Sequence, residues 1–351
     1  MTRQLGFIVI TVLGLAAGRA GAAETSPIPE AAYGIAGSWP LGGSGAWDYL
    51  ALDASGARLF VTRGDRVDVV QTANGKLSGT IPHTQGVHGV AFAPSLNRGF
   101  TSNGATNTVS VFELDTLRVV QEVPISGKNP DAIIFEPQYG HIITANGESS
   151  NLSVLDAGAL QVVATVALPG PPEFMVADGA GNVYINIETD PGKLVTVDAK
   201  SLAVKSTWPL PGCSNPTGLA IDVPHHRLFS VCGNQVMTVT DSVSGRQTTK
   251  ILIGGGPDAA AVDSDLGLVF SANGLDGTLT VIREETPDQY RVSATVTTQV
   301  SARTMTLDPA THTLYFAAAK LGPAPPATED KPHPYPSVIP NSFVILVARP
   351  K

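Results

Sequence analysis

The chain has little of what long helices and membrane spans require. Only 15% of its 351 residues are charged, and 36 glycines and 27 prolines are spread along it. Because Gly and Pro destabilise helix interiors, this composition excludes a mainly helical protein. It favours many short strands joined by tight turns. After the N-terminal segment, no apolar run is long enough to span a bilayer.

Basic residues are also scarce. The 22 Lys and Arg are outnumbered by 30 Asp and Glu, which gives a net charge of −8. Removal of an N-terminal segment that carries Arg3 and Arg19 would leave 20 basic and 30 acidic residues, a net charge of −10. Proteins that bind nucleic acid rely on clustered Lys and Arg. The acidic balance therefore disfavours a nucleic-acid partner.

The first 22 residues have the parts of a secretory signal peptide. A positive start at Arg3 precedes an apolar core at residues 5–17 and small residues at 20–22. The apolar core is short for a transmembrane anchor, which is the alternative interpretation. We expect cleavage of residues 1–22, a short linker at residues 23–34, and a mature protein that is periplasmic or secreted, monomeric and without a membrane anchor.

Only two cysteines occur, Cys213 and Cys232. In an oxidising compartment a lone pair of cysteines is a disulfide candidate, and two buried free thiols are the alternative. The repeat described next places both residues on one face of one repeat unit, which favours the disulfide. Their spacing is not Cys-x-x-Cys, so a redox centre is not indicated.

A pattern of apolar runs recurs about every 42 residues. The stretches GFTSNGATNTVSVFEL (99–114), HIITANGESSNLSVLD (141–156) and LVFSANGLDGTLTVI (268–282) are similar, and each follows another apolar run. Seven such units of four strands predict an all-β fold, a seven-bladed β-propeller of antiparallel blades over residues 35–351. The last unit ends in its third strand, SFVILVARPK. Residues 35–41 are predicted to supply its outer strand and so close the ring.

The repeats carry a family resemblance. The runs FTSNG, ITANG, FSANG and FVTRG, each followed by a strand of the VSV type, resemble the exported YVTN/YncE-like β-propeller repeat family. NPDAIIFEP and GPDAAAVD are similar to the Pro-x-Gly-hydrophobic lead-in of that family, with Ala in place of Gly. The resemblance covers residues 35–351. It implies the fold and says little about activity.

The residue before each innermost strand is expected to face a central funnel on one face of the propeller, here called the top face. Converging charges of one sign raise carboxylate pKa values or attract a cation. We therefore predict a ligand site, with Asp48, Asp131, Glu173 and Asp258 as candidate ligands of Ca²⁺ or Zn²⁺. The alternative is that each side chain bonds to its own turn. This funnel ring consists of Asp48, His88, Asp131, Glu173, Thr217, Asp258 and Arg303.

Two further features adjoin the predicted funnel. Trp47 precedes Asp48 and is a candidate to stack on a planar or sugar-like ligand, or else to pack beneath its loop. A Pro-rich insertion at residues 320–342 cannot form a helix and is expected over the top face. It is predicted to be a lid or a docking segment, with His333 and Tyr335 as contacts, or a solvated spacer. The three Asn-Gly pairs (103–104, 146–147, 273–274) are interpreted as turn residues that accept positive φ.

The sequence favours a non-enzymatic module that binds a small molecule or a protein partner in the funnel, assisted by a cation. It lacks the Gly-x-Ser-x-Gly and zinc-protease motifs. The alternative is a metal-assisted hydrolase or lyase of a lactone-like or glycan-derived substrate, as in some similar propellers. There the carboxylates and His88 would bind metal or act as base, and Arg303 would stabilise an oxyanion. Single-stranded DNA binding, proposed within the resembling family, comes last because the chain is acidic.

Overall fold

The computed structural model describes residues 32–328 and 336–351. The expected signal peptide, most of the linker, and His333 and Tyr335 lie outside the described residues. Within them the chain forms twenty-seven β-strands and two short 3-10 helices, η1 (Pro94–Leu96) and η2 (Gly147–Ser149), so the all-β prediction is confirmed. None of the helices in the described part is long and apolar enough to cross a membrane.

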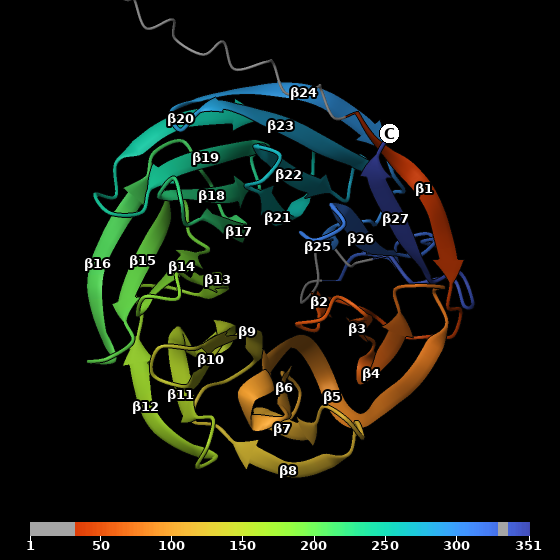
Figure 1. Cartoon of the computed structure of the whole chain (residues 1–351), viewed down its shortest axis with the longest axis vertical. Helices are drawn as coiled ribbons and strands as arrows, with labels where there is room; N and C mark the ends of the chain where they lie inside the picture. The colour runs from red at the N-terminus through yellow and green to blue at the C-terminus, as the bar shows by residue number, and fades with distance from the viewer. Residues whose placement is uncertain (1–31, 329–335) are drawn as a thin grey trace, which may run out of the picture. The chain divides into compact units, whose positions relative to one another are not determined.

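The strands form five four-stranded sheets and one seven-stranded sheet, arranged around a common centre (Figure 1). The seven-stranded sheet contains β2 (Leu50–Leu52), β3 (Arg58–Thr62), β4 (Gly64–Gln71), β5 (Leu77–Ala93), β6 (Arg98–Asn103), β7 (Thr108–Glu113) and β8 (Val119–Pro124). The next two sheets contain β9 (Pro130–Glu136), β10 (His141–Asn146), β11 (Asn151–Asp156) and β12 (Gln161–Ala167), and then β13 (Pro172–Ala177), β14 (Asn182–Ile187), β15 (Gly192–Asp198) and β16 (Ala203–Leu210).

The remaining sheets complete the arrangement. Two of them contain β17 (Pro216–Asp222), β18 (Arg227–Cys232), β19 (Val236–Asp241) and β20 (Gln247–Leu252), and β21 (Pro257–Asp263), β22 (Leu268–Asn273), β23 (Thr278–Thr286) and β24 (Gln289–Thr297). The last contains β25 (Thr304–Asp308), β26 (Thr313–Ala318), β27 (Val344–Pro350) and β1 (Tyr33–Pro40). The first strand of each repeat lies nearest the centre, as Figure 1 shows.

The seven-stranded sheet arises from the long strand β5. Its first part, from Leu77 to Pro82, pairs with β4, and its last part, from Val87 to Ala93, pairs with β6. Between the two parts, His83 and Gly86 adopt positive φ values of 63° and 66°. The strand therefore runs without a loop from the outer edge of one repeat to the innermost position of the next.

Both ends of the described chain lie in one sheet. β1 pairs antiparallel with β27, from Tyr33 opposite Pro350 to Pro40 opposite Val344. The strand predicted at residues 35–41 is thus an outer strand, and it begins at Tyr33. Trp39, at its end, lies against the turn after β4, where a Cβ on Gly75 would come within 2.2 Å of the indole. Only glycine, which also accepts the φ of 70° found there, fits beneath the ring.

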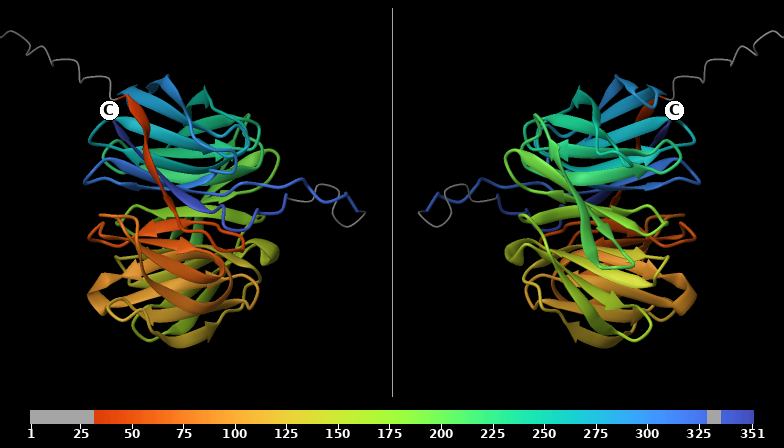
Figure 2. Two further views of the ribbon diagram at one scale, coloured as in Figure 1. Left: turned by 90° about the vertical axis from the view of Figure 1, so that its right-hand side faces the viewer. Right: turned by 90° about the vertical axis from the view of Figure 1, so that its left-hand side faces the viewer.

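Apolar side chains fill the spaces between neighbouring sheets. Phe229 and Val239, from β18 and β19, pack in one cluster with Val269 and Ile282 from β22 and β23. Burial of one such side chain stabilises the fold by about 1.5–3 kcal/mol. Each sheet is therefore held mainly by its two neighbours. The described ends of the Pro-rich insertion project from one face of this arrangement (Figure 2).

The predicted disulfide between Cys213 and Cys232 is present. The two Cα atoms lie 5.4 Å apart, and both side chains are buried. The bond joins the loop after β16 to the end of β18, and so encloses the innermost strand β17.

Reduction of this disulfide should destabilise the protein. The bond closes a sequence separation of 19 residues, for which the loss of chain entropy in the unfolded state corresponds to about 3 kcal/mol. We expect the Cys213→Ser, Cys232→Ser double variant to unfold in guanidinium with a free energy lower by about this amount. Alkylation of two thiols in native, non-reduced protein would contradict the bond.

A buried arginine joins two segments that lie far apart in the sequence. Arg63 is 1% exposed, and its guanidinium lies 3.7 Å from the ring centroid of Phe343. Its Nη2 donates to the backbone carbonyls of Gly42 and Ser44, at 3.0 and 3.3 Å. Burial lowers the pKa of Arg63 to about 10, and Asp68 opposes this effect. The side chain therefore fastens the segment between β1 and β2 to the segment before β27.

Truncation of Arg63 should be costly for this reason. We expect Arg63→Ala to lower the free energy of unfolding by about 3 kcal/mol, since it removes a buried side chain that packs on Phe343 and leaves two backbone carbonyls without their donor. The matched control is Arg118→Ala, because Arg118 is 69% exposed in its ion pair with Glu113 and should change stability by less than about 1 kcal/mol. Equal effects of the two variants in denaturant titrations would contradict this role.

Candidate functional site

The backbone turns the side chains of the funnel ring out of the regular pleat. Four innermost strands, β9, β13, β17 and β21, begin with a proline, which donates no backbone hydrogen bond. The register of each, and of β5 after Val87, shifts directly afterwards, which leaves the ring residue unpaired. Such bulges re-aim a side chain. The five residues placed in this way are His88, Asp131, Glu173, Thr217 and Asp258.

Three residues of the funnel ring come together closely. His88 Nδ1 lies 2.6 Å from Asp48 Oδ2 and 3.6 Å from Asp131 Oδ1. Asp131 Oδ1 is buried and has no hydrogen-bond partner. Each residue offers one ligand atom, and these atoms lie within 4.8 Å of one another. This set can hold a metal ion through one nitrogen and two oxygens.

Arg303 joins two other members of the ring. Its Nε lies 2.8 Å from Asp258 Oδ2, and its Nη2 lies 3.5 Å from Asp48 Oδ1. The Thr304 hydroxyl donates to the Asp48 carbonyl at 2.8 Å, which fixes the backbone of that residue. Asp48 thus lies between an imidazole and a guanidinium. The positive charge of Arg303 compensates part of the acidic ring.

The other predicted site residues are placed less centrally. The Thr217 hydroxyl donates at 2.9 Å to the carbonyl of Pro257, which lies in the neighbouring repeat and not in the turn of Thr217 itself. Trp47 is 5% exposed and packs against Phe343 at 5.5 Å between ring centroids. Of the four predicted metal ligands, Asp48 and Asp131 belong to the close set with His88, and Glu173 and Asp258 lie outside it.

The electrostatics of the ring reflect burial of several carboxylates together. Burial and the neighbouring Asp48 raise the pKa of Asp131 to about 6. Burial raises the pKa of Asp258 to about 7, although Arg303 opposes it. Burial and Asp131 raise the pKa of Glu173 well above its usual range. For His88, burial lowers the pKa, but the hydrogen bond to Asp48 and the negative charges of Asp131 and Asp48 together outweigh it, and the net shift is upward.

One acidic residue of the site was missed by sequence reasoning. Glu188 follows β14, and its charge contributes to the raised pKa values of Glu173 and Asp258. Burial also raises the pKa of Glu188 itself. Superposition of the repeats on one another would have revealed it, because Glu188 occupies the position of Gly104 and Gly274 in the Asn-Gly pairs.

The Asn-Gly pairs support the ring, but for a reason other than the predicted one. Neither residue of these pairs has positive φ. The buried Asn103 side chain instead donates to Thr108 and Ser110 of β7, at 3.1 and 2.8 Å. A Cβ on Gly104 would come within 2.8 Å of His88 Nε2. Asn146 and Asn273 make equivalent bonds, so the asparagines brace the strands and glycine at 104 makes room for the imidazole.

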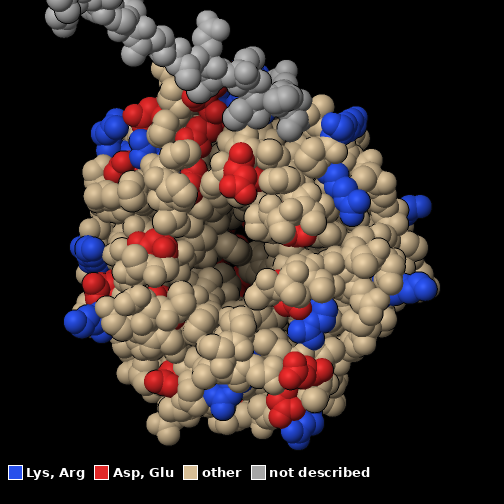
Figure 3. All heavy atoms as spheres, in the orientation of Figure 1, with Lys and Arg blue, Asp and Glu red and all other residues tan. Residues whose placement is uncertain are grey.

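Cavities adjoin the ring on the side of the insertion. One of about 400 Å³ is lined by Trp47, Arg303, Pro336 and Val338. Another of about 260 Å³ is lined by residues that include Asp258, Arg303 and Pro336. The described part of the insertion therefore forms a wall of both cavities. Figure 3 shows the opposite face, which also has a central hollow.

Comparison with known proteins bears on the fold alone. No protein-family model and no curated protein matches the sequence. A solved structure of Kuenenia stuttgartiensis hydrazine synthase is similar with a TM-score of 0.70 and 15% identity, over 78% of this chain and 92% of that one. The chain is a β-propeller. At this identity the likeness carries no activity from one protein to the other.

The raised pKa values predict how stability depends on pH. Asp131 and Asp258 titrate near pH 6 and 7 when folded, against about 4 when unfolded. The folded state therefore binds more protons between about pH 4 and 7, and this contribution to stability falls as pH rises through that window. The upward shift of His88 acts in the same direction, since its contribution is lost as pH rises through its folded pKa.

We expect Asp258→Asn to remove part of this dependence. The loss of stability of the wild type between pH 5 and 8 should exceed that of the variant by on the order of 2 kcal/mol. Denaturant titrations at several pH values measure the difference. Asp265→Asn is the matched control, because Asp265 is an exposed aspartate outside the ring. Parallel pH profiles for wild type and Asp258→Asn would contradict the raised pKa.

Proposed function

We propose that the protein is an exported seven-bladed β-propeller that binds a small molecule or a protein partner in its top-face funnel, assisted by a divalent cation. The observation that carries the proposal is the convergence of Asp48, His88 and Asp131, with the ligand atoms of all three within 4.8 Å. Such a set is costly to bury without a partner of opposite charge.

The blade count rests on the two halves of β5. The first half of β5, counted with β2–β4, gives one four-stranded blade. The second half, counted with β6–β8, gives another, and the other five sheets bring the number of blades to seven. The pairing of β1 with β27 supports closure of the ring by the N-terminal strand. Membership of the YVTN/YncE-like family agrees with this architecture. The Cys213–Cys232 disulfide supports export to the periplasm or the outside of the cell.

The donor set favours Zn²⁺ over Ca²⁺. Calcium takes six to eight oxygen ligands, whereas zinc accepts a histidine nitrogen with carboxylate oxygens at four positions. The close set offers one nitrogen from His88 and two oxygens from Asp48 and Asp131, with a position left for a ligand. Arg303 holds Asp48 and Asp258 in place. A bound ligand would contact the cation and reach the cavities beside Trp47 and Pro336.

The enzymatic alternative is favoured by one contact. Donation from His88 Nδ1 to Asp48, at 2.6 Å, would leave Nε2 of a neutral ring as an acceptor. A carboxylate that orients an imidazole is the arrangement used by general bases. In this reading Arg303 would stabilise the oxyanion formed when water attacks a lactone-like carbonyl.

Metal titration tests the binding proposal. We expect Zn²⁺ to bind the apoprotein with about one equivalent in the funnel at pH 7.5, and Asp131→Asn to weaken that binding at least about tenfold. Affinity should fall as pH is lowered through about 6, because the cation competes with the proton on Asp131. Calorimetry measures both effects, and Asp265→Asn is the control. Binding that is unaffected by Asp131→Asn would overturn the proposed site.

A panel of simple lactones separates the two readings. Turnover by the zinc-loaded wild type that disappears in His88→Ala would establish the enzymatic alternative. If the protein is a binding module, we expect no turnover of any lactone in the panel. A ligand that copurifies in the funnel should then stay with the protein on gel filtration, and native mass spectrometry should identify it.

A further inference from the structure

We propose that the face opposite the funnel carries a second zinc site, formed by Asp222, His225 and Glu284. Asp222 ends the innermost strand β17, His225 lies in the turn that follows, and Glu284 lies in β23 of the neighbouring sheet. The site therefore bridges two adjacent sheets. It shares no residue with the funnel ring, so it stands independently of the function proposed above.

The geometry has two carboxylates directed at one ring nitrogen. His225 Nδ1 lies 2.9 Å from Asp222 Oδ2 and 3.0 Å from Glu284 Oε1. In a tetrahedral zinc site with bonds of about 2.0–2.1 Å, ligand atoms lie roughly 3.3 Å apart. Small side-chain movements thus suffice for all three atoms to bind one ion, which would replace the proton on Nδ1.

The buried carboxylate of Glu284 distinguishes this cluster from an ordinary His–Asp pair. Its side chain is 6% exposed, and Oε1 is buried without a hydrogen-bond partner. Nδ1 carries at most one proton, and its geometry directs that hydrogen bond to Asp222. Glu284 Oε1 is consequently left facing a nitrogen that has no second proton to give. A metal ion between the three atoms would satisfy all of them.

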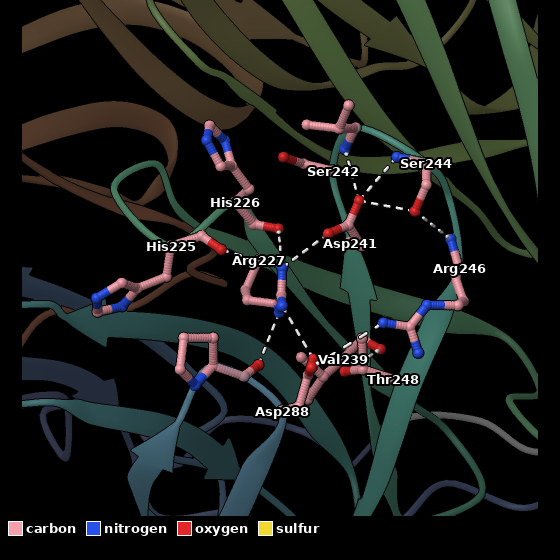
Figure 4. A network of polar contacts seen from close by, with 12 residues as sticks. His225, His226, Arg227, Val239, Asp241, Ser242, Ser244, Arg246, Thr248 and Asp288 are labelled. Atoms are coloured by element: carbon pink, nitrogen blue, oxygen red, sulfur yellow. Dashed lines mark hydrogen bonds and ion pairs between the residues drawn. The ribbon is translucent and has the colours of Figure 1, made fainter.

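The surroundings hold the ligands in place and leave a path for entry. Asp222 is fully buried, and its second oxygen accepts a hydrogen bond of 3.0 Å from Ser264. Arg227 donates to the His225 carbonyl at 3.0 Å and also binds Asp241 and Asp288 (Figure 4). Figure 4 shows the His225 ring pointing away from this arginine. With 43% of its side chain exposed, His225 gives solvent and ion access to the site.

The neighbouring repeat offers a natural control. His312 Nδ1 lies 2.7 Å from the buried Asp263 Oδ2 of the preceding sheet, which makes a second His–Asp contact on the same kind of turn. Among the described residues, no third acidic, histidine or cysteine side chain joins that pair to make a metal-binding group. A purely structural His–Asp pair should therefore behave alike at both places, whereas a zinc site should occur only where Glu284 is added.

Zinc binding by the full-length protein tests the inference. Metal-stripped wild type and the variants Glu284→Gln, His225→Ala, His312→Ala and Asp131→Asn are titrated with Zn²⁺ against a chromophoric chelator at pH 7.5. Bound zinc is counted by elemental analysis after gel filtration. We expect Glu284→Gln and His225→Ala each to lower the affinity of one equivalent at least about tenfold, and His312→Ala to leave the zinc content unchanged.

The number of zinc equivalents lost in each variant distinguishes this site from the funnel site. Loss of one equivalent in His225→Ala, with the funnel equivalent lost only in Asp131→Asn, supports two sites. Loss from one equivalent to none in His225→Ala supports this site and contradicts the funnel cation. Wild-type protein that binds no zinc at 100 µM free ion, or unchanged binding in folded His225→Ala, overturns the inference. Because His225 is partly exposed, that variant keeps the test valid if Glu284→Gln does not fold.

Discussion

A bulge at the start of an innermost strand is the constraint on which most of the funnel ring depends, and it follows Val87 as well as four prolines. Pro130, Pro172, Pro216 and Pro257 each precede a residue that has no partner in the neighbouring strand. Asp131, Glu173, Thr217 and Asp258 are thereby presented at equivalent places on one scaffold. The repeat sets the position of the side chain, and the residue type at that position can differ from one repeat to the next.

Because the residue type varies, charge is distributed unevenly around the funnel ring. Thr217 is engaged with backbone, whereas Asp48 lies between His88 and Arg303 in the most polar part of the funnel. Charge is therefore concentrated on the side where the first and last repeats meet, which is also where the insertion joins the sheet. A ligand that enters there would meet carboxylates and a guanidinium beside the cavity that Trp47 helps to line.

Much of the fold follows from the sequence, since period and alternation reflect backbone geometry that repeats regularly. The strands, the outer position of residues near Trp39, and the disulfide could be predicted in this way. Glu188 was missed because it replaces the glycine of the Asn-Gly pairs, and only alignment of the repeats with one another reveals that position. The role of Asn103 was also misjudged, since a turn and a buried side-chain brace leave the same Asn-Gly signature. That His88, rather than Glu173 or Asp258, joins the closest set depends on side-chain directions that the period does not encode.

The pairing of β1 with β27 has a consequence for the order in which the molecule can fold. Tyr33 and Pro350 are neighbours in space but almost the full described length of the chain separates them. Contacts of such high sequence separation form late, because their loop-closure entropy must be met by structure already formed in between. During synthesis the N-terminal strand therefore stays unpaired until the final residues emerge. A chain stopped before Val344 would leave β26 and β1 without the strand that pairs with both.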